Sequence, residues 1–278
     1  MDETDSRRPL FVRSLAKGLR VLRVFDEAHR TMSLGEIAAA AGLGKSAAQR
    51  SVHTLAELGY LRQDPRTRQY GLSPKVLELG FAYLRADELV GRATPHLMAA
   101  NRRSEETVNL TEPDGTEMVY VARVPSRHAV SVDVVLGTRL PMYCTAPGRA
   151  ILAFLPEEEA RHLLARSRRV ALTPNTLTDP GAILGCLAQA RAEGFALADQ
   201  EVYVGDISIA APVFDFSGRP VAAVNIAVPA ARWSVTDCLA RLAPEVVATA
   251  RVISREQGAE AAPQSGRASP RLRSRARA

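Results

Sequence analysis

The sequence predicts two folded domains: an N-terminal all-α winged helix-turn-helix over residues 11–72 and a C-terminal α+β domain with an antiparallel sheet over residues 91–255. Three observations lead to this fold class: amphipathic segments closed by glycine turns, an arginine-rich turn between two β-prone runs, and a later alternation of short strands and helices. We expect a helix over residues 73–90 to link the domains and residues 256–278 to form a disordered basic tail. A chain of 278 residues is long enough for each domain to bury its own core.

The first two helices are predicted by apolar spacing and by capping residues. In the first, apolar residues recur at intervals of three or four, namely Leu15, Leu19, Leu22 and Phe25. Ser14 is the expected N-cap of this helix. The segment from Ser33 to Glu36 has the S-x-x-E pattern of a capping box, so a second helix should begin there. It should end at Gly42, because glycine readily adopts the left-handed conformation that closes a helix.

A third helix should follow at once, with one apolar and one cationic face. Its apolar residues share one side and are expected to point inward: Ala48, Val52, Leu55 and Leu58. The opposite side is polar and carries Lys45, Ser46, Gln49, Arg50 and His53. In a helix-turn-helix the second paired helix enters the DNA major groove, where amides and guanidinium groups match base edges. We therefore predict that these five residues contact DNA.

A turn-rich arginine segment over residues 62–68 lies between two short β-prone runs, which is typical of a two-stranded wing. Arg66 and Arg68 in this wing are expected to neutralise DNA phosphates. Ser73 and Pro74 then supply an N-cap and a proline at the first helical position, so the linker helix should start there and run to about Leu89.

The remaining chain shows short alternating runs and helical segments. Strands are expected at residues 107–110, 117–123, 129–135, 195–197, 208–214 and 221–228. Helices are expected at residues 95–103, 148–155, 157–165, 180–193 and from 235 to about 255. Residues 112–115 and 215–220 contain the turn residues of hairpins, which favours a largely antiparallel sheet.

Charge and cysteine usage narrow the class of protein. The formal net charge is +6, but five of these charges come from the arginines of the C-terminal tail, so any DNA-binding patch must be local. The three cysteines form no metal-ligand pattern and are expected to be reduced, and we expect neither a metal nor a cofactor. There is no apolar run of membrane-spanning length, and residues 1–8 are charged, so a cytoplasmic location is expected.

Residues 11–22, 33–59 and 70–80 resemble the DNA-binding half of IclR-type transcriptional regulators. Residues 137–142 and 144–150 resemble the effector-pocket loop and the following helix of that family. The resemblance implies a GAF-like effector-binding domain, a homo-oligomer that is at least a dimer and could pair into tetramers, and a pseudo-palindromic operator in double-stranded DNA. Activation and repression, and contact with RNA polymerase, stay open.

The family's C-terminal signature is matched by Gly194, Glu201 and residues 208–215. Ala198 departs from it, because the pattern usually has Asp or Ser there, although Asp199 stands next to it. Residues 120–124 and 137–141 look most like the regulators of aromatic-acid breakdown through the β-ketoadipate pathway. That resemblance implies an aromatic or other small carboxylate effector, such as protocatechuate or p-hydroxybenzoate, and control of a catabolic operon.

A small anionic effector also fits the residues themselves. The segment from Thr145 to Gly148 leads into a predicted helix whose N-terminal dipole favours an anion, and Arg149 adds a cation there. Met142 and Tyr143 are expected to wall an apolar pocket. The family resemblance places three further residues across this pocket, namely Asp199, Ser208 and Asn225. A capped surface helix, a sheet core and internally satisfied polar groups are the alternative explanations for these residues.

Two other functions compete with a regulator. An enzyme such as a hydrolase is disfavoured because the sequence lacks a GxSxG elbow, an HExxH pair, a P-loop and a GxGxxG turn, and its five histidines are scattered. A small-molecule sensor without specific DNA binding would have a neutral or acidic third helix and wing, which the cationic residues contradict. The basic tail either binds DNA nonspecifically or is simply solvated.

Overall fold

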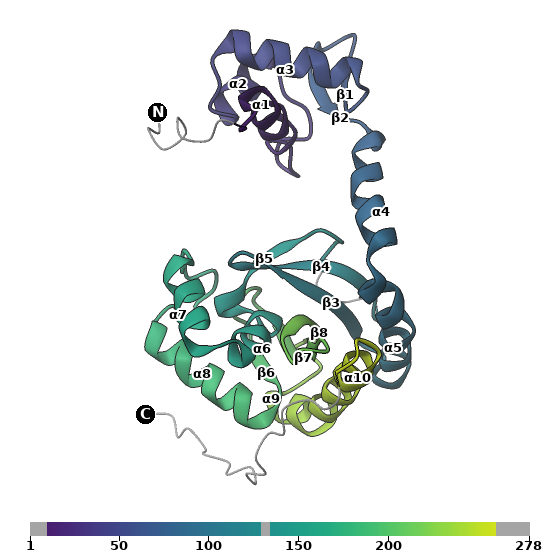
Figure 1. Cartoon of the computed structure of the whole chain (residues 1–278), viewed down its shortest axis with the longest axis vertical. Coiled ribbons are helices and arrows are strands. Elements are labelled where there is room, and N and C mark those ends of the chain that lie inside the picture. The colour runs from purple at the N-terminus through teal and green to yellow at the C-terminus, as the bar shows by residue number, and fades with distance from the viewer. Residues whose placement is uncertain (1–9, 129–133, 260–278) are drawn as a thin grey trace. The chain divides into compact units, whose positions relative to one another are not determined.

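The computed structural model describes residues 10–128 and 134–259, which fall into two compact units, Met1–Tyr83 and Leu84–Ala278 (Figure 1). The division lies inside the segment predicted as the linker. From residue 260 onward, the predicted disordered tail lies outside the described residues. Its first residue, Glu256, is instead the last residue of a helix.

From residue 10 to residue 72, the first unit contains three helices and a two-stranded antiparallel sheet: α1 (Arg13–Leu22), α2 (Leu34–Ala40), α3 (Lys45–Glu57), β1 (Leu61–Gln63) and β2 (Tyr70–Leu72). The predicted capping box is confirmed, since the Ser33 side chain accepts from the Glu36 N–H and the Glu36 carboxylate accepts from the Ser33 N–H. Gly42 has a φ of +60°, as expected for a glycine that closes a helix. Together these elements form the predicted winged helix-turn-helix.

Three details of the first unit differ from the sequence expectation. The N-cap of α1 is Val12, and Ser14 lies inside the helix. Leu15 and Leu19 are more than half exposed, because they border an open groove between α1 and α3. Leu58 follows the end of α3, lines the same groove and is also exposed, so it does not face the core. The core centres instead on Val21, Ile37, Val52, Leu55 and Leu61.

The linker helix and its successor are divided differently from the prediction. A short helical turn η2 (Pro74–Val76) leads into α4 (Leu77–Ala86), and α5 (Glu88–Ser104) begins directly afterwards. Asp87 separates them, because its carboxylate accepts from the backbone N–H groups of Leu89 and Val90 and so caps α5. The predicted helix start at Pro95 is therefore wrong, since this proline lies within α5.

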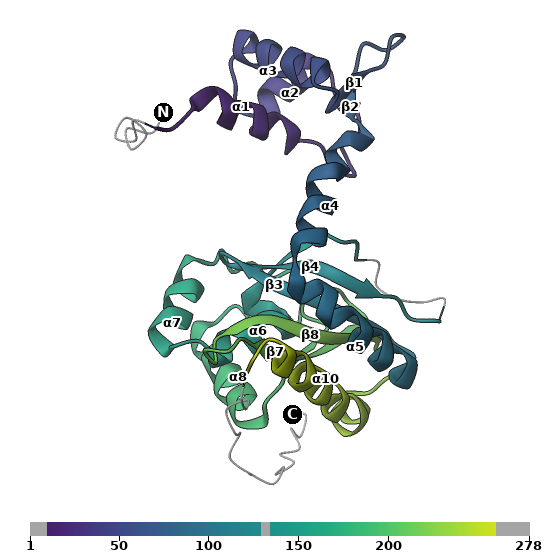
Figure 2. The same ribbon diagram turned by 45° about the vertical axis from the view of Figure 1, so that its right-hand side comes forward.

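Among the described residues, the second unit is built on a six-stranded antiparallel sheet in the order β5-β4-β3-β8-β7-β6 (Figure 1). Figure 2 shows β3, β4, β7 and β8 of this sheet from another side. The strands of the sheet are β3 (Thr107–Asp114), β4 (Glu117–Val124), β5 (Arg139–Pro141), β6 (Ala196–Asp199), β7 (Asp206–Phe214) and β8 (Pro220–Pro229). All but β5 were predicted within a few residues. The strand predicted over residues 129–135 lies mostly outside the described residues, and its described part, Val134 and Val135, is not in a strand.

Helices cover both faces of this sheet. Besides α5, the helices of this unit in the described residues are α6 (Ala146–Phe154), α7 (Glu157–Arg166), α8 (Pro180–Glu193), α9 (Val235–Asp237) and α10 (Ala243–Glu256). A π-helical turn, η4 (Cys238–Leu242), separates α9 from α10, so the helix predicted from residue 235 is not a regular α-helix throughout. Apolar residues of α5 and α10 pack on one face of the sheet, and those of α6 and α8 pack on the other.

Side chains alternate between the two faces along each strand. On β3 and β8, Val108, Leu110, Val224 and Ile226 belong to the core beneath α5 and α10. Their neighbours in sequence point to the side of α6 and α8, where small residues such as Ala210 and Ala223 pack. This second face carries most of the buried polar residues of the sheet.

Candidate functional site

The exposed face of α3 is polar and cationic. All five residues predicted on this face are exposed, namely Lys45, Ser46, Gln49, Arg50 and His53. The guanidinium of Arg50 donates a hydrogen bond of 2.7 Å to the Ser46 hydroxyl, one helical turn earlier. No acidic residue occurs in the helix before Glu57 at its end. The face can therefore meet an anionic partner without local repulsion.

The wing between β1 and β2 presents two exposed arginines, Arg66 and Arg68. Asp64 shapes its turn, because the carboxylate accepts from the backbone N–H groups of Arg66 and Thr67 at 2.8 and 3.0 Å. Those hydrogen bonds from Thr67 and Arg66 lower the pKa of Asp64. Arg68 adopts a φ of +61°, and its carbonyl accepts from the Gln63 side chain at 2.9 Å. The turn is thus held by its own polar groups, and the arginine charges stay in solvent.

A cavity opens in the second unit on the α6 side of the sheet. The empty space measures about 470 Å³ when the open mouth is included. The cavity itself measures about 30 Å³. The lining includes three residues that were predicted to bind an effector, Thr145, Ser208 and Asn225. Ala146 and Pro147, the first residues of α6, also line it, so the positive end of that helix's dipole lies at the cavity.

A row of polar residues crosses the sheet beneath this cavity. Arg123 on β4 lies opposite Asn109 on β3, which in turn lies opposite Asn225 on β8. The amide of Asn225 donates to the Ser208 hydroxyl on β7 at 3.1 Å. Asn109 and Asn225 are each 1% exposed and Ser208 is also buried, whereas Arg123 at the end of the row is half-buried. The cavity floor therefore offers hydrogen-bonding groups in an otherwise apolar sheet.

Asp206 and Tyr120 line the same cavity and have strongly shifted ionisation. Burial raises the pKa of the Asp206 carboxyl to about 7, and the Arg123 charge only partly opposes that rise. Burial also raises the pKa of Tyr120, with a smaller contribution from the negative charge of Asp206. Asp206 is therefore kept largely uncharged below neutral pH by the surrounding protein.

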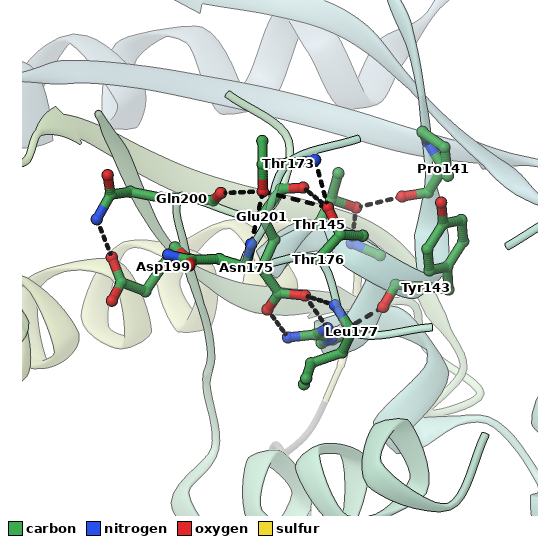
Figure 3. A network of polar contacts seen from close by, with 12 residues as sticks. Pro141, Tyr143, Thr145, Thr173, Asn175, Thr176, Leu177, Asp199, Gln200 and Glu201 are labelled. Carbon is green, nitrogen blue, oxygen red and sulfur yellow. Dashed lines mark hydrogen bonds and ion pairs between the residues drawn. The ribbon is translucent and has the colours of Figure 1, made fainter. Parts of the chain in front are cut away.

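Arg149 forms a buried ion pair with Glu201. Figure 3 shows Glu201 with its neighbours Thr176 and Leu177. The Arg149 guanidinium donates to both oxygens of Glu201 at 2.5 and 2.6 Å, and its Nε donates to the Tyr143 carbonyl at 2.9 Å. Glu201 also accepts from the Leu177 N–H at 2.9 Å, and its own carbonyl accepts from Thr176 at 2.6 Å. This pair ties α6 to the loops around residues 173–177 and 200–205.

The other predicted effector residues, Met142, Tyr143, Gly148, Arg149 and Asp199, do not line this cavity, and Arg149 and Asp199 line a separate hollow instead. Tyr143 is buried, and its hydroxyl donates to the Val170 carbonyl at 2.6 Å. Gly148 packs directly against Met142, where any Cβ would overlap the Met142 backbone. Asp199 lies on β6 and accepts from the Gln200 side chain at 3.2 Å. Thr145 does line the cavity, while its hydroxyl also accepts from the Gly148 N–H and so caps α6.

Sequence reasoning did not select six polar residues that line the cavity: Asn109, Tyr120, Arg123, Glu201, Tyr203 and Asp206. The sequence did contain a pattern that could have indicated some of these residues. Residues 107–111 and 206–209 alternate polar and apolar side chains, although both faces of these strands are covered by helices. Regular polar positions in a strand buried on both faces indicate a polar internal surface.

A helix-turn-helix with an exposed cationic helix and wing, joined in one chain to an α+β domain with a polar cavity, defines a ligand-responsive DNA-binding regulator. The IclR helix-turn-helix domain model matches residues 14–65, and the model of the bacterial transcriptional regulator IclR C-terminal domain matches residues 81–255. The chain belongs to the IclR family of transcriptional regulators. Its relatives are regulators and not enzymes, in agreement with the sequence analysis.

Relatives of known sequence or structure are similar along most of their length. The Pca regulon regulatory protein of Pseudomonas putida is 37% identical over 87% of this chain and 83% of that protein. The crystal structure of the Thermotoga maritima IclR has a TM-score of 0.70 and 30% identity, covering 88% of this chain and 98% of that one. An IclR homolog from Microbacterium hydrocarbonoxydans, complexed with 4-hydroxybenzoate, has a TM-score of 0.71 and 25% identity over 87% and 99% of the two chains.

Within residues 10–128 and 134–259, no helix combines the length and the apolar character needed to cross a membrane.

Proposed function

We propose that this regulator controls a catabolic operon in response to a small carboxylate, most specifically an aromatic acid. The observation that carries the proposal is the cavity at the N-terminal end of α6, where Thr145, Ala146 and Pro147 lie close to the row that contains Arg123. A helix N-terminus and an arginine both favour a carboxylate. The Pca regulon regulatory protein and the homolog complexed with 4-hydroxybenzoate support the aromatic choice.

The proposed DNA contacts are the exposed residues of α3 and the wing: Lys45, Ser46, Gln49, Arg50, His53, Arg66 and Arg68. Two copies of the chain, bound as a dimer in the cytoplasm, read the two halves of a pseudo-palindromic operator. Effector binding changes the preferred placement of the two DNA-binding units, which requires different effector affinities in the two arrangements.

The effector contacts we propose are Thr145, Ser208 and Asn225, which line the cavity. Met142, Tyr143, Gly148, Arg149 and Asp199 are proposed with them, although they lie outside its lining. The cavity itself, at about 30 Å³, is smaller than a benzoate ring requires. Binding of an aromatic acid therefore includes displacement of lining side chains, and it should stabilise the second unit.

The test combines selection of DNA with a ligand screen. Full-length protein is used to enrich operator sequences from random duplexes, and anisotropy then measures affinity for the enriched DNA with and without each acid. We expect a palindromic consensus whose affinity changes at least about tenfold with one aromatic acid. Enrichment of no consensus would contradict specific DNA binding.

A thermal-shift screen separates the effector classes. A ligand at 100 times its dissociation constant adds about 2.7 kcal/mol of stability. A shift with pyruvate, glyoxylate or a sugar acid, and with no aromatic acid, would keep the regulator and reject the aromatic effector.

A further inference from the structure

The residues that follow the wing are hydrogen-bonded to the end of α3. Three successive backbone carbonyls there, those of Leu58, Gly59 and Tyr60, accept from Ser73 or Lys75. The Lys75 ammonium donates to the Leu58 carbonyl at 3.0 Å. The Ser73 hydroxyl donates to the Gly59 carbonyl, and the Ser73 N–H donates to the Tyr60 carbonyl at 2.9 Å. We call these three hydrogen bonds the α3 clasp.

Lys75 suits the end of α3 in charge and in shape. The last carbonyls of a helix have no partner within the helix, and a cation is favourable at this negative end of the helix dipole. The Lys75 ammonium also lies 5.4 Å from the centre of the Tyr60 ring, within the range of a cation–π contact. Its side chain passes beside Gly59, where a Cβ would lie 3.5 Å from the Lys75 Cδ. The lysine therefore contacts three successive residues at the end of α3.

The same two residues begin the linker. Ser73 is the N-cap of η2, because its hydroxyl also accepts from the Lys75 N–H at 3.2 Å. η2 continues directly into α4. Between α3 and η2 the wing is closed at its base, where Leu61 pairs with Leu72. One short segment thus ends the wing, starts the linker helix and binds the end of α3, so a rotation of the start of α4 is transmitted to α3.

Building on the proposed function, in which a dimer reads two half-sites, we propose that Ser73 and Lys75 are positioning residues that set the half-site spacing the dimer accepts. They act through α3, whose orientation relative to the linker helix the α3 clasp fixes. One added base pair turns one half-site by about 35° relative to the other. A rigid connection between α3 and the linker rejects that operator, and a loose connection tolerates it. Loss of the α3 clasp therefore broadens the spacing preference and leaves the half-site sequence unchanged.

The test measures spacing preference with the full-length protein and the operator enriched from random duplexes. Anisotropy gives the affinity for that operator and for versions with one or two base pairs added or removed between the half-sites. We expect the parent protein to bind the altered spacings at least about tenfold more weakly. In the double variant Ser73→Ala, Lys75→Met this ratio should fall to about threefold or less. Ser73→Thr keeps the hydroxyl and should retain the ratio of the parent.

Ser33→Ala is the matched control for Ser73→Ala. Ser33 is also an N-cap, since its hydroxyl accepts from the Glu36 N–H at 3.3 Å, but it caps α2. Both alanine variants should lower the melting temperature slightly, because each loses a capping hydrogen bond. Only Ser73→Ala should lower the spacing ratio. An equal fall of the ratio in both variants would indicate a general loosening of the first unit and would overturn the positioning role.

The outcomes separate this proposal from the proposed function. If the parent protein binds a single half-site as tightly as the enriched operator, the dimeric operator is overturned and spacing control with it. If the parent discriminates between spacings and the double variant discriminates equally well, the positioning role is overturned while the dimeric operator stands.

The single variants decide the question if the double variant does not fold. Ser73→Ala leaves the charge of the protein unchanged, so a lower spacing ratio in this variant supports positioning. Lys75→Met replaces an exposed side chain. An equal loss of affinity at every spacing in Lys75→Met, with the ratio of the parent retained in both single variants, would identify Lys75 as a phosphate contact and overturn the positioning role.

Discussion

The arginines of the two units are used in opposite ways. Arg50, Arg66 and Arg68 in the first unit are exposed, and their charges stay in water. Arg149 in the second unit is 1% exposed and gives its guanidinium to Glu201 and to the Tyr143 carbonyl. This difference shows that an arginine near a site can bind a ligand only if no carboxylate of the protein already pairs with its charge.

The comparison also separates stability from function. An exposed cation contributes little to folding, because water solvates it equally well in the unfolded chain. A buried ion pair is different, since loss of one partner leaves the other charge without water and without a counter-ion. Substitutions in the two units should therefore act on different measurements: those in the second unit on stability, and those at the exposed arginines on DNA affinity.

The largest effect is expected for Arg149→Met, which strands the buried Glu201 carboxylate. The second unit should lose about 3–5 kcal/mol of stability. Urea unfolding followed by tryptophan fluorescence measures this unit selectively, because Trp233 is the only tryptophan in the chain. The control is Arg161→Met, whose partner Glu157 is exposed, and it should change stability by less than about 0.5 kcal/mol. Similar losses in both variants would contradict the contrast.

Asp206 should make stability depend on pH in the direction opposite to that of an ordinary salt-bridged aspartate. Its pKa is raised from 3.8 to about 7 in the folded protein, so the folded state holds a proton that the unfolded state has released between pH 4 and 7. The free energy of unfolding should fall as pH rises through this window, by about 4 kcal/mol, and level off above it. Melting curves across the window measure the slope. Asp206→Asn should flatten it, and an unchanged slope would exclude Asp206 as the source.

Gly148→Ala tests whether this glycine serves packing. A Cβ here would overlap the Met142 backbone, which cannot move as easily as a side-chain end. We expect a loss of about 1–3 kcal/mol, seen in the same tryptophan-monitored unfolding. Gly185→Ala in α8 is the comparison variant, because a Cβ there meets no atom within 4 Å, and it should be neutral or stabilising. A stable Gly148→Ala protein would show that the Met142 segment yields.

The smallest effect on stability is expected for Arg50→Ala, in spite of a large effect on binding. Stability should change by less than about 0.5 kcal/mol, because the side chain is exposed. Affinity for operator DNA should fall by roughly tenfold, and a phosphate contact would lower the salt slope by about one. Anisotropy titrations at several salt concentrations measure both. Operator affinity equal to that of the parent would remove Arg50 from the DNA-binding surface.

Local signals explain what the sequence could predict. The capping box at Ser33, the glycine turn at Gly42 and the helix α8 (Pro180–Glu193) depend on residues close together in the chain, and all three are found as expected. The exposed face of α3 could likewise be predicted from the spacing of its polar residues. The groove that leaves Leu15 exposed could not be predicted from the sequence. Apolar spacing identifies the apolar face of a helix but not the element that packs against it.

The cavity was less predictable because long-range pairing builds it. Arg149 and Glu201 are 52 residues apart in the sequence, and no local pattern predicts their contact. Asn109 becomes part of a polar row only because β3 pairs with both β4 and β8. A sequence shows which strand positions are polar, but the strand order decides which of them share a wall.

The strand order also has a consequence for synthesis of the chain. The central pair of the sheet joins β3 (Thr107–Asp114) to β8 (Pro220–Pro229), so the cavity cannot form until residue 229 has left the ribosome. The helix-turn-helix and its wing are complete by Leu72. At about 5–20 residues per second, the first unit is finished roughly 8 to 30 seconds before the last cavity strand appears. A newborn chain therefore acquires its DNA-binding surface well before it acquires any means of sensing an effector.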